Sequence, residues 1–102
     1  MTLDQVVKRN KEIVPFDRER IEDAIYVAAR VVGNGRGRQW SEALSWAVVG
    51  ILEERFGRDG LVPHAGEVER VIEEVLIKSG HHEVAEAYVQ YRQRRAEERT
   101  AR

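Results

Sequence analysis

Cysteine is absent from this 102-residue sequence, and proline occurs only twice. Without cysteine these residues can form no disulfide, no thiolate zinc site and no cysteine nucleophile, and they are compatible with a reducing cytoplasm. No apolar run approaches the roughly 20 residues that cross a bilayer, and the first residues lack the apolar core of a signal peptide. We therefore expect a cytoplasmic location and no membrane partner.

Net charge is almost absent as well, at −1, but the charges are unevenly distributed along the chain. Residues 1–38 contain eight Lys and Arg against six Asp and Glu, and residues 92–102 contain five against two, whereas residues 39–91 contain four against ten. If the fold brings the two basic ends together, their charges add up to one local positive site. Such a site on a slightly acidic protein favours a compact anion over a long polyanion.

Hydrophobic residues make up 42% of the sequence and charged residues 34%, which is typical of one folded, helix-rich domain. Apolar residues recur at three- and four-residue spacing in four segments, and each segment is predicted to form a helix with a buried stripe. Asp17 is the expected N-cap of the first helix, and Glu69 is assigned to the outward face of the third. The four helices are expected at residues 18–32, from about 41 to 56, between 64 and 79, and from about 82 into the basic tail.

Short strand-prone runs precede the first helix. Val6-Val7 and Ile13–Phe16 lie on either side of Arg9–Glu12, and this pattern predicts a β-hairpin. The segment Leu61–His64 is too short for a helix and is expected to add a third strand, although its proline restricts it to a sheet edge or a strand end. The predicted fold class is therefore α+β, a four-helix bundle capped by a small three-stranded β-sheet.

Basic side chains are predicted on the hairpin, at the first turn of the first helix and on the last helix. They are Lys8, Arg9, Arg20, Arg92, Arg94 and Arg95. Phosphate oxygens favour such groups because charge-assisted hydrogen bonds are strong, and the start of a helix adds unpaired N–H donors and a favourable dipole. A solvated basic surface is the alternative that charge alone leaves open.

Other chemistries find less support in the sequence. The segment GNGRGR at residues 33–38 follows a helix and lacks the Gly-Lys-Ser/Thr ending of a phosphate loop, which favours a linker. The three histidines have no acidic ligand at a defined spacing, and Tyr88 and Tyr91 lie on a predicted inward stripe, where aromatic residues are more often core than base-stacking platforms. Because no nucleophile, base and orienting partner can be assembled, we expect no enzyme and no metal site.

Three blocks occur in a specific order: VVKRN at residues 6–10, PFDRERIEDAI at 15–25 and VLIKSGHHEVAEAYVQYRQRR at 75–95. Together they resemble the ATP-cone, the nucleotide-sensing domain found at the N-terminus of many ribonucleotide reductases and in the repressor that controls their genes. The blocks are similar to the family's Lys-Arg strand, to its Phe and acidic cap before a helix, and to its Gly-His, Ala-Tyr and Tyr-Arg pattern. The resemblance implies an ATP-cone domain at residues 1–97 and a frayed basic tail at 98–102.

The resemblance also implies an adenine nucleotide bound between the sheet and the helices. ATP or dATP would act as the effector, accompanied by Mg²⁺. The implied nucleotide-binding residues are Val6 and Ile21 at the base, Lys8, Arg9 and Arg20 at the phosphates, and Arg94 as a helper from the last helix. The partners implied are the catalytic domain or subunit of a ribonucleotide reductase, under allosteric control, and further copies in a homo-oligomer. The chain is expected to be either an excised regulatory domain or a stand-alone cone.

The sequence departs from the family pattern at two site positions. Lys11 stands where members commonly have Gly in the hairpin turn, and Arg20 stands where Lys is frequent. The cysteine zinc ribbon of the family's repressors is also missing, which disfavours direct nucleic-acid binding. Two alternatives remain open, namely a nucleic-acid or protein interaction module that uses the Arg-rich C-terminus and a dimerisation unit with a degenerate nucleotide site.

Overall fold

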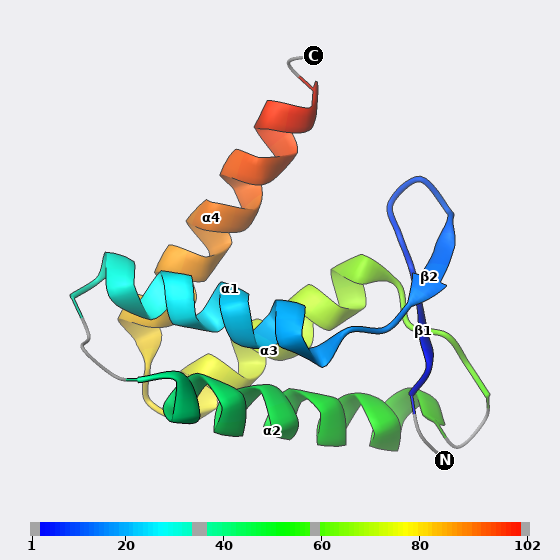
Figure 1. Cartoon of the computed structure of the whole chain (residues 1–102), viewed down its shortest axis with the longest axis horizontal. Helices are drawn as coiled ribbons and strands as arrows, with labels where there is room; N and C mark the ends of the chain where they lie inside the picture. The colour runs from blue at the N-terminus through cyan, green and yellow to red at the C-terminus, as the bar shows by residue number, and fades with distance from the viewer. Residues whose placement is uncertain (1–2, 34–36, 58–59, 101–102) are drawn as a thin grey trace.

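The computed structural model describes residues 3–33, 37–57 and 60–100, and within them it contains one hairpin and four helices (Figure 1). The elements are β1 (Gln5–Val7), β2 (Ile13–Pro15), α1 (Arg18–Val31), α2 (Arg38–Phe56), α3 (Ala65–Lys78) and α4 (His82–Thr100). The expected α+β class and the four helices are therefore confirmed. Among the described residues, no helix combines the length and apolar character needed to cross a membrane.

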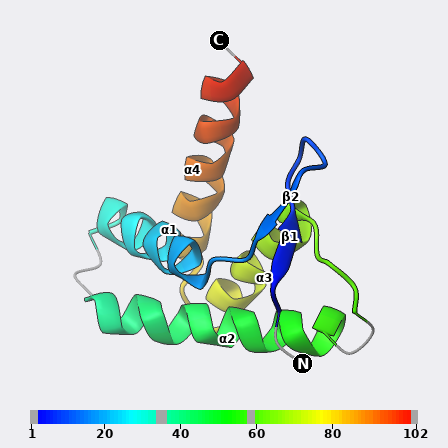
Figure 2. The same ribbon diagram turned by 45° about the vertical axis from the view of Figure 1, so that its right-hand side comes forward.

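The four helices enclose one hydrophobic core. Helix α1 packs against α2 and α4, while α3 packs against both α2 and α4. Ile25, Leu52 and Leu76 are completely buried where these helices meet, as the periodicity requires. Helix α4 leaves the bundle steeply, so that its C-terminal half projects past the other helices in both views (Figures 1 and 2). The described basic side chains of this half of α4 therefore lie outside the hydrophobic core.

The start of α1 follows from its local sequence. Asp17 has an extended backbone and its carboxylate accepts a hydrogen bond from the backbone N–H of Glu19 at 3.0 Å, so it is the N-cap that was predicted. Helix α2 begins at Arg38, three residues before the expected start at Ser41. At the other end of the chain, α4 is helical as far as Thr100, and the last part of the expected basic tail lies outside the described residues.

The hairpin is antiparallel and pairs Gln5 with Pro15. Its loop is closed by the N–H of Lys11, which donates to the carbonyl of Lys8 at 2.9 Å, while the N–H of Lys8 donates to the carbonyl of Glu12 at 2.8 Å. Lys11 has a φ of 70°, in the left-handed region that favours glycine. This is the geometry of a three-residue hairpin loop with a left-handed third residue. Lys11 therefore occupies a backbone conformation that is strained for a residue with a side chain.

The prediction of a third strand is wrong, because the described sheet has two strands. The segment before α3 forms a single parallel bridge between His64 and Val7, in which the N–H of Val7 donates to the carbonyl of Pro63 at 2.9 Å. Two features limit the pairing to this bridge. Pro63 has no N–H to donate to a ladder, and α3 begins at Ala65, directly after the bridge. The apolar residues Leu61 and Val62 favour a strand in the sequence, but neither belongs to a strand in the structure.

Candidate functional site

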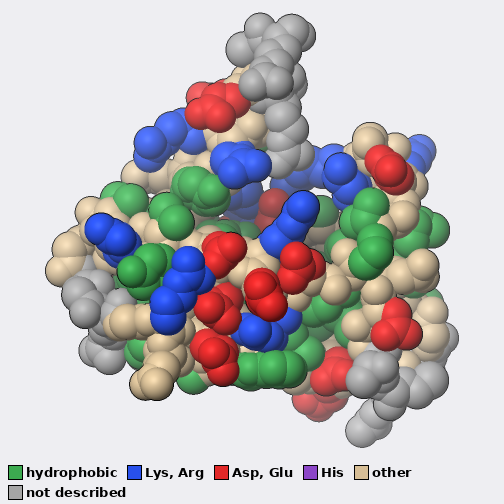
Figure 3. Space-filling view, viewed as in Figure 1, with side chains coloured by type: hydrophobic (Ala, Val, Ile, Leu, Met, Phe, Trp, Pro, Cys, Tyr) green, Lys and Arg blue, Asp and Glu red, His purple; other side chains and the backbone are tan. Residues whose placement is uncertain are grey.

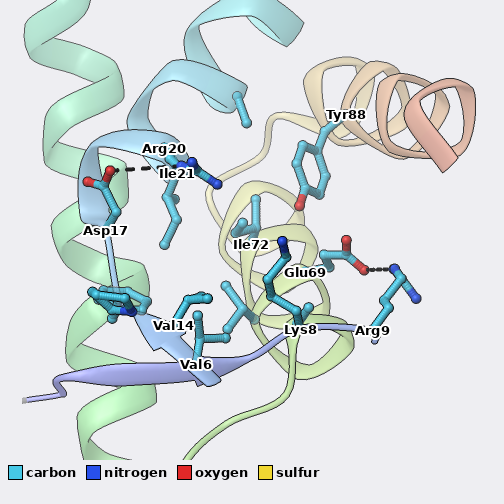
Figure 4. Close-up of a pocket in the computed structure, with 15 residues that line it drawn as sticks. Val6, Lys8, Arg9, Val14, Asp17, Arg20, Ile21, Glu69, Ile72 and Tyr88 are labelled. Atoms are coloured by element: carbon cyan, nitrogen blue, oxygen red, sulfur yellow. Dashed lines mark hydrogen bonds and ion pairs between the residues drawn. The ribbon is translucent and has the colours of Figure 1, made fainter. Parts of the chain in front are cut away.

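A cavity of about 260 Å³ lies between the hairpin, the start of α1, and helices α3 and α4 (Figure 4). One part of its wall is apolar and the other carries charged and polar groups. The apolar side chains are Val6, Val14, Pro15, Phe16, Ile21, Ala24, Ala65, Val68 and Ile72. The polar side chains are Lys8, Arg9, Asp17, Arg20, Glu69 and Tyr88. Such a cavity is suited to a ligand with an apolar face and a charged end.

A second cavity of about 450 Å³ shares Arg9, Arg20, Glu69 and Tyr88 with the first. It continues along α4, where Tyr91, Arg92, Arg95 and Ala96 form its wall. In the space-filling view, Lys and Arg side chains gather in the depression between α4 and the hairpin (Figure 3). The two basic ends of the chain therefore meet, as the charge distribution suggested.

Arg20 reaches the cavity because of its position on the first turn of α1. Its side chain is 86% exposed, and its Nε lies 3.9 Å from a carboxylate oxygen of Asp17, the N-cap of α1. Figure 4 shows Arg20 and Lys8 extending toward the same space, with Val6, Val14 and Ile21 forming the floor beneath them. Because a 3.9 Å contact between exposed groups is weak, Arg20 can turn toward a bound anion at little cost.

Arg9 reaches the cavity from the hairpin loop, and a carboxylate already holds it there. Its guanidinium donates a short hydrogen bond to Glu69 of α3, sixty positions further along the chain. The same Glu69 oxygen lies 3.5 Å from a guanidinium nitrogen of Arg92 on α4. Arg92 also contacts Glu73 at 2.8 Å. The hairpin, α3 and α4 are thus joined through one ionic network at the edge of the cavity.

Tyr88 lines both cavities. Its side chain is only 5% exposed, and Figure 4 shows its hydroxyl pointing toward the space between Arg20 and Glu69. Burial raises the pKa of Tyr88 well above its ordinary value, and the nearby negative charge of Glu69 raises it further. The hydroxyl is therefore protonated near neutral pH and can donate a hydrogen bond to a ligand oxygen.

Five of the six predicted site residues line the first cavity: Val6, Lys8, Arg9, Arg20 and Ile21. Arg94 is exposed, and it is not among the described residues that line either cavity. The neighbouring Arg92 and Arg95 line the second cavity in its place. The positions agree with the prediction for five residues, while the role of all six in binding a nucleotide stays a prediction.

The sequence analysis missed Glu69 as a member of the site and assigned it to a solvent-facing surface. A signal for Arg92 and Arg95 was available, since they follow Tyr88 by four and seven residues and so share its helical face. Arg94 follows Tyr88 by six residues and lies off that face. Glu69 carried no comparable local signal, because its environment is created by the hairpin packing over α3.

Clusters of possible metal ligands were sought among the described side chains. Within residues 3–33, 37–57 and 60–100, no group of three or more His, Asp or Glu side chains is arranged to hold a metal ion. The two carboxylates in the first cavity have other roles, since Asp17 caps α1 and Glu69 pairs with two arginines. An ion at this site would have to arrive with its ligand.

The fold and the cavity together define a small helical domain whose cavity is suited to a compact polyanion with an apolar face. The model of the ATP cone domain family matches residues 4–97, and the chain belongs to this family. It is 34% identical over 96 residues to a vitamin B12-dependent ribonucleoside-diphosphate reductase of Thermoplasma acidophilum, covering 89% of this chain and 12% of that protein.

Two further relatives have related names. A vitamin B12-dependent ribonucleoside-diphosphate reductase of Mycobacterium tuberculosis is 36% identical over 98 residues, covering 96% of this chain and 13% of the relative. A ribonucleoside-diphosphate reductase subunit alpha of Treponema pallidum is 28% identical over 99 residues, covering 95% of this chain and 12% of the relative. The chain thus spans a small fraction of the length of each relative.

Proposed function

We propose that this domain binds ATP or dATP as an effector, in the cytoplasm, and controls a ribonucleotide reductase without hydrolysing the nucleotide. The observation that carries the proposal is the convergence of Lys8, Arg9 and Arg20 around one cavity with an apolar floor. These cations come from two separate elements, the hairpin and the start of α1. A merely solvated surface does not require cations from separate elements to line one cavity with an apolar floor.

The cavity suggests how the nucleotide is oriented. The adenine ring is expected against the apolar wall that includes Val6 and Ile21, where burial of its faces is favourable. The phosphates then extend toward Lys8, Arg9 and Arg20, which can form charge-assisted hydrogen bonds with their oxygens. From α4, Arg92 and Arg95 line the adjoining cavity and can add cations near the phosphates, while the helper role of Arg94 stays a prediction.

Magnesium enters the proposal only as the ion of the nucleotide. Mg²⁺ prefers oxygen ligands and usually retains several waters, and in nucleotide sites it is held largely by the phosphates. Asp17 and Glu69 are the carboxylates that line the first cavity, and both are engaged elsewhere. We therefore assign no resident metal site to the chain.

In this proposal the reductase reaction is carried out by a partner and not by this domain. This chain corresponds to 12–13% of the reductase relatives, and we place catalysis in a separate domain or subunit. Regulation requires that the nucleotide bind two states of the protein with different affinity. The projecting half of α4 carries Arg92 and Arg95 to the cavity, so it is the element that we expect to contact the catalytic part or another copy of the chain.

Isothermal titration calorimetry with ATP and with dATP tests the proposal. We expect saturable binding of one or both nucleotides and a folded protein by circular dichroism. The Lys8→Met and Arg9→Met variants should bind more weakly, because each loses a cation from the cavity. Absence of saturable binding at millimolar nucleotide by the folded protein would refute the function. Sizing on a calibrated column with and without nucleotide then tests whether occupancy changes the oligomeric state.

A further inference from the structure

Glu69 places a negative charge inside a cavity whose other charged lining groups are mainly cations. Its side chain is 19% exposed, whereas that of Arg9 is 55% exposed. Glu69 lines both cavities and so lies where a ligand that spans them must pass. A carboxylate in this position repels phosphate and occupies the donors that phosphate needs, and therefore requires an explanation.

The contacts of Glu69 distinguish it from the other acidic residues of α3. One of its oxygens is shared between Arg9 of the hairpin and Arg92 of α4. Glu73, one turn further along α3, contacts Arg92 and lines neither of the two cavities that Arg9 and Arg20 share. Glu69 is thus the carboxylate that links the hairpin to α4 within the described part of the chain.

We propose that Glu69 is a resident anion that holds Arg9 in the ligand-free domain and is displaced from it by a phosphate group of the nucleotide. The inference rests on the proposed function. Phosphate and carboxylate oxygens accept the same charge-assisted hydrogen bonds from a guanidinium, so they compete for Arg9. A polyphosphate carries more charge than Glu69, and it can therefore take over this arginine.

Displacement changes the network in a defined direction. In the structure one oxygen of Glu69 is shared between Arg9 and Arg92. Once Arg9 turns to the phosphate, Glu69 contacts only Arg92 of these two arginines. The ion pair between Glu69 on α3 and Arg92 on α4 then no longer competes with Arg9 for the same oxygen. The nucleotide-bound state therefore differs from the unbound state in which arginine Glu69 contacts. This difference allows the nucleotide to bind the two states with different affinity, as regulation requires.

Titration calorimetry on the Glu69→Gln variant tests this inference, with Glu74→Gln as the matched control, because Glu74 also lies on α3 but contacts Arg55 and Lys78, which line neither cavity. Glutamine keeps the size of Glu69 but removes its charge, so ATP should bind roughly tenfold more tightly than to the original protein. The affinity for inorganic tripolyphosphate should rise by a similar factor. The affinity for adenosine should not change, because Glu69 competes only with phosphate groups. Glu74→Gln should bind ATP within about twofold of the original protein.

The outcomes separate the two proposals. If the original protein binds ATP and Glu69→Gln binds it equally or more weakly, Glu69 positions Arg9 for the ligand and the competition is refuted while the proposed function stands. If no folded variant binds ATP, both are refuted. Should Glu69→Gln fail to fold, Glu69→Asp provides the second test, since its shorter side chain withdraws from Arg9 while keeping the charge. We expect it to bind ATP several-fold more tightly, and unchanged or weaker binding would overturn the inference.

Discussion

Arg18 and Arg20 lie two residues apart on the first turn of α1 and point to opposite sides of the helix. Arg18 faces α2, where its guanidinium donates to the Ser45 hydroxyl at 2.6 Å, contacts Glu22 at 2.8 Å and stacks over Trp46 at 4.7 Å. Arg20 faces the cavity. Because neighbouring positions on a helix are rotated by about 100°, residues two apart cannot share a face. One arginine is therefore structural and the other is available to a ligand.

We expect the Arg20→Met variant to bind ATP about tenfold to a hundredfold more weakly than the original protein, because it loses a charge-assisted hydrogen bond of about 1.5–3 kcal/mol. Titration calorimetry measures the affinity, and urea unfolding measures the stability, which should change little at this exposed position. An unchanged affinity would remove Arg20 from the phosphate site.

The Arg18→Met variant is the matched control. It removes the Arg18 guanidinium from Glu22 and from the buried Ser45, while Glu22 keeps its contact with Arg38 at 3.3 Å and the Ser45 hydroxyl still donates to the Glu42 carbonyl. The free energy of unfolding should fall by about 1–3 kcal/mol, because charge-assisted hydrogen bonds are lost. Its folded fraction should bind ATP as the original protein does. A loss of affinity in this variant equal to that of Arg20→Met would show that the two arginines are not functionally distinct.

This pair also shows how much of the site could be predicted from the sequence. The helical period and the expected cap at Asp17 were local signals, and together they fixed where α1 begins and where Arg20 lies. The hairpin was equally local, because strand-prone runs flank a short polar loop. Recognising Lys8, Arg9 and Arg20 as parts of one site depended on the resemblance to the ATP-cone, since spacing alone does not show which elements meet.

The errors arose where the outcome depended on distant parts of the chain. Whether Leu61–His64 forms a strand depends on how much chain remains between its proline and α3, and only one bridge fits. The rotation of α4, which its packing against α1 and α3 determines, could not be predicted locally either. It brings Arg92 and Arg95 to the second cavity, while the helper role of Arg94 stays a prediction. Glu69 was assigned to solvent because the hairpin that covers it is sixty positions away.

The α4 arginines allow a direct test of that rotation. Arg95 lines the second cavity and its guanidinium donates to the Tyr91 hydroxyl at 3.1 Å, whereas Arg94 is exposed and is not among the described lining residues. We expect Arg95→Met to weaken ATP binding about threefold to tenfold, as the loss of one partly screened charge would. Arg94→Met should leave the affinity within twofold. The reverse order, measured by the same titration, would confirm the prediction made for Arg94 and contradict the expectation for Arg95.

The hairpin loop should become more stable when Lys11 is replaced by Gly. The left-handed φ of 70° costs a residue with a side chain about 1–2 kcal/mol, and glycine avoids this cost but loses about 0.5–1 kcal/mol through the greater freedom of its unfolded chain. The free energy of unfolding should rise by about 0.5 kcal/mol in urea titrations. Lys11→Val is the opposite control and should lower it, because a β-branched residue is strained at this φ. A lower stability for Lys11→Gly would contradict the loop geometry.

The raised pKa of Tyr88 predicts a loss of stability in alkaline solution. Its folded pKa lies above the ordinary value of 10.0, so between these two values the unfolded chain binds fewer protons than the folded one. The stabilisation is therefore complete below pH 10 and is lost as the pH rises above it, by up to about 1.4 kcal/mol per pH unit. Urea titrations from pH 9 to 11 should show this decline in the original protein and a shallower one in Tyr88→Phe, which keeps the buried ring but has no hydroxyl to ionise.

Tyr91→Phe is the control for the alkaline experiment, because Tyr91 lies on the same helix one turn further on and is only half-buried. Its stability should follow that of the original protein across the same pH range. Equal slopes for Tyr88→Phe and the original protein would show that the Tyr88 hydroxyl reaches solvent freely. The same hydroxyl could then not be the hydrogen-bond donor shielded from water that the burial of Tyr88 indicates.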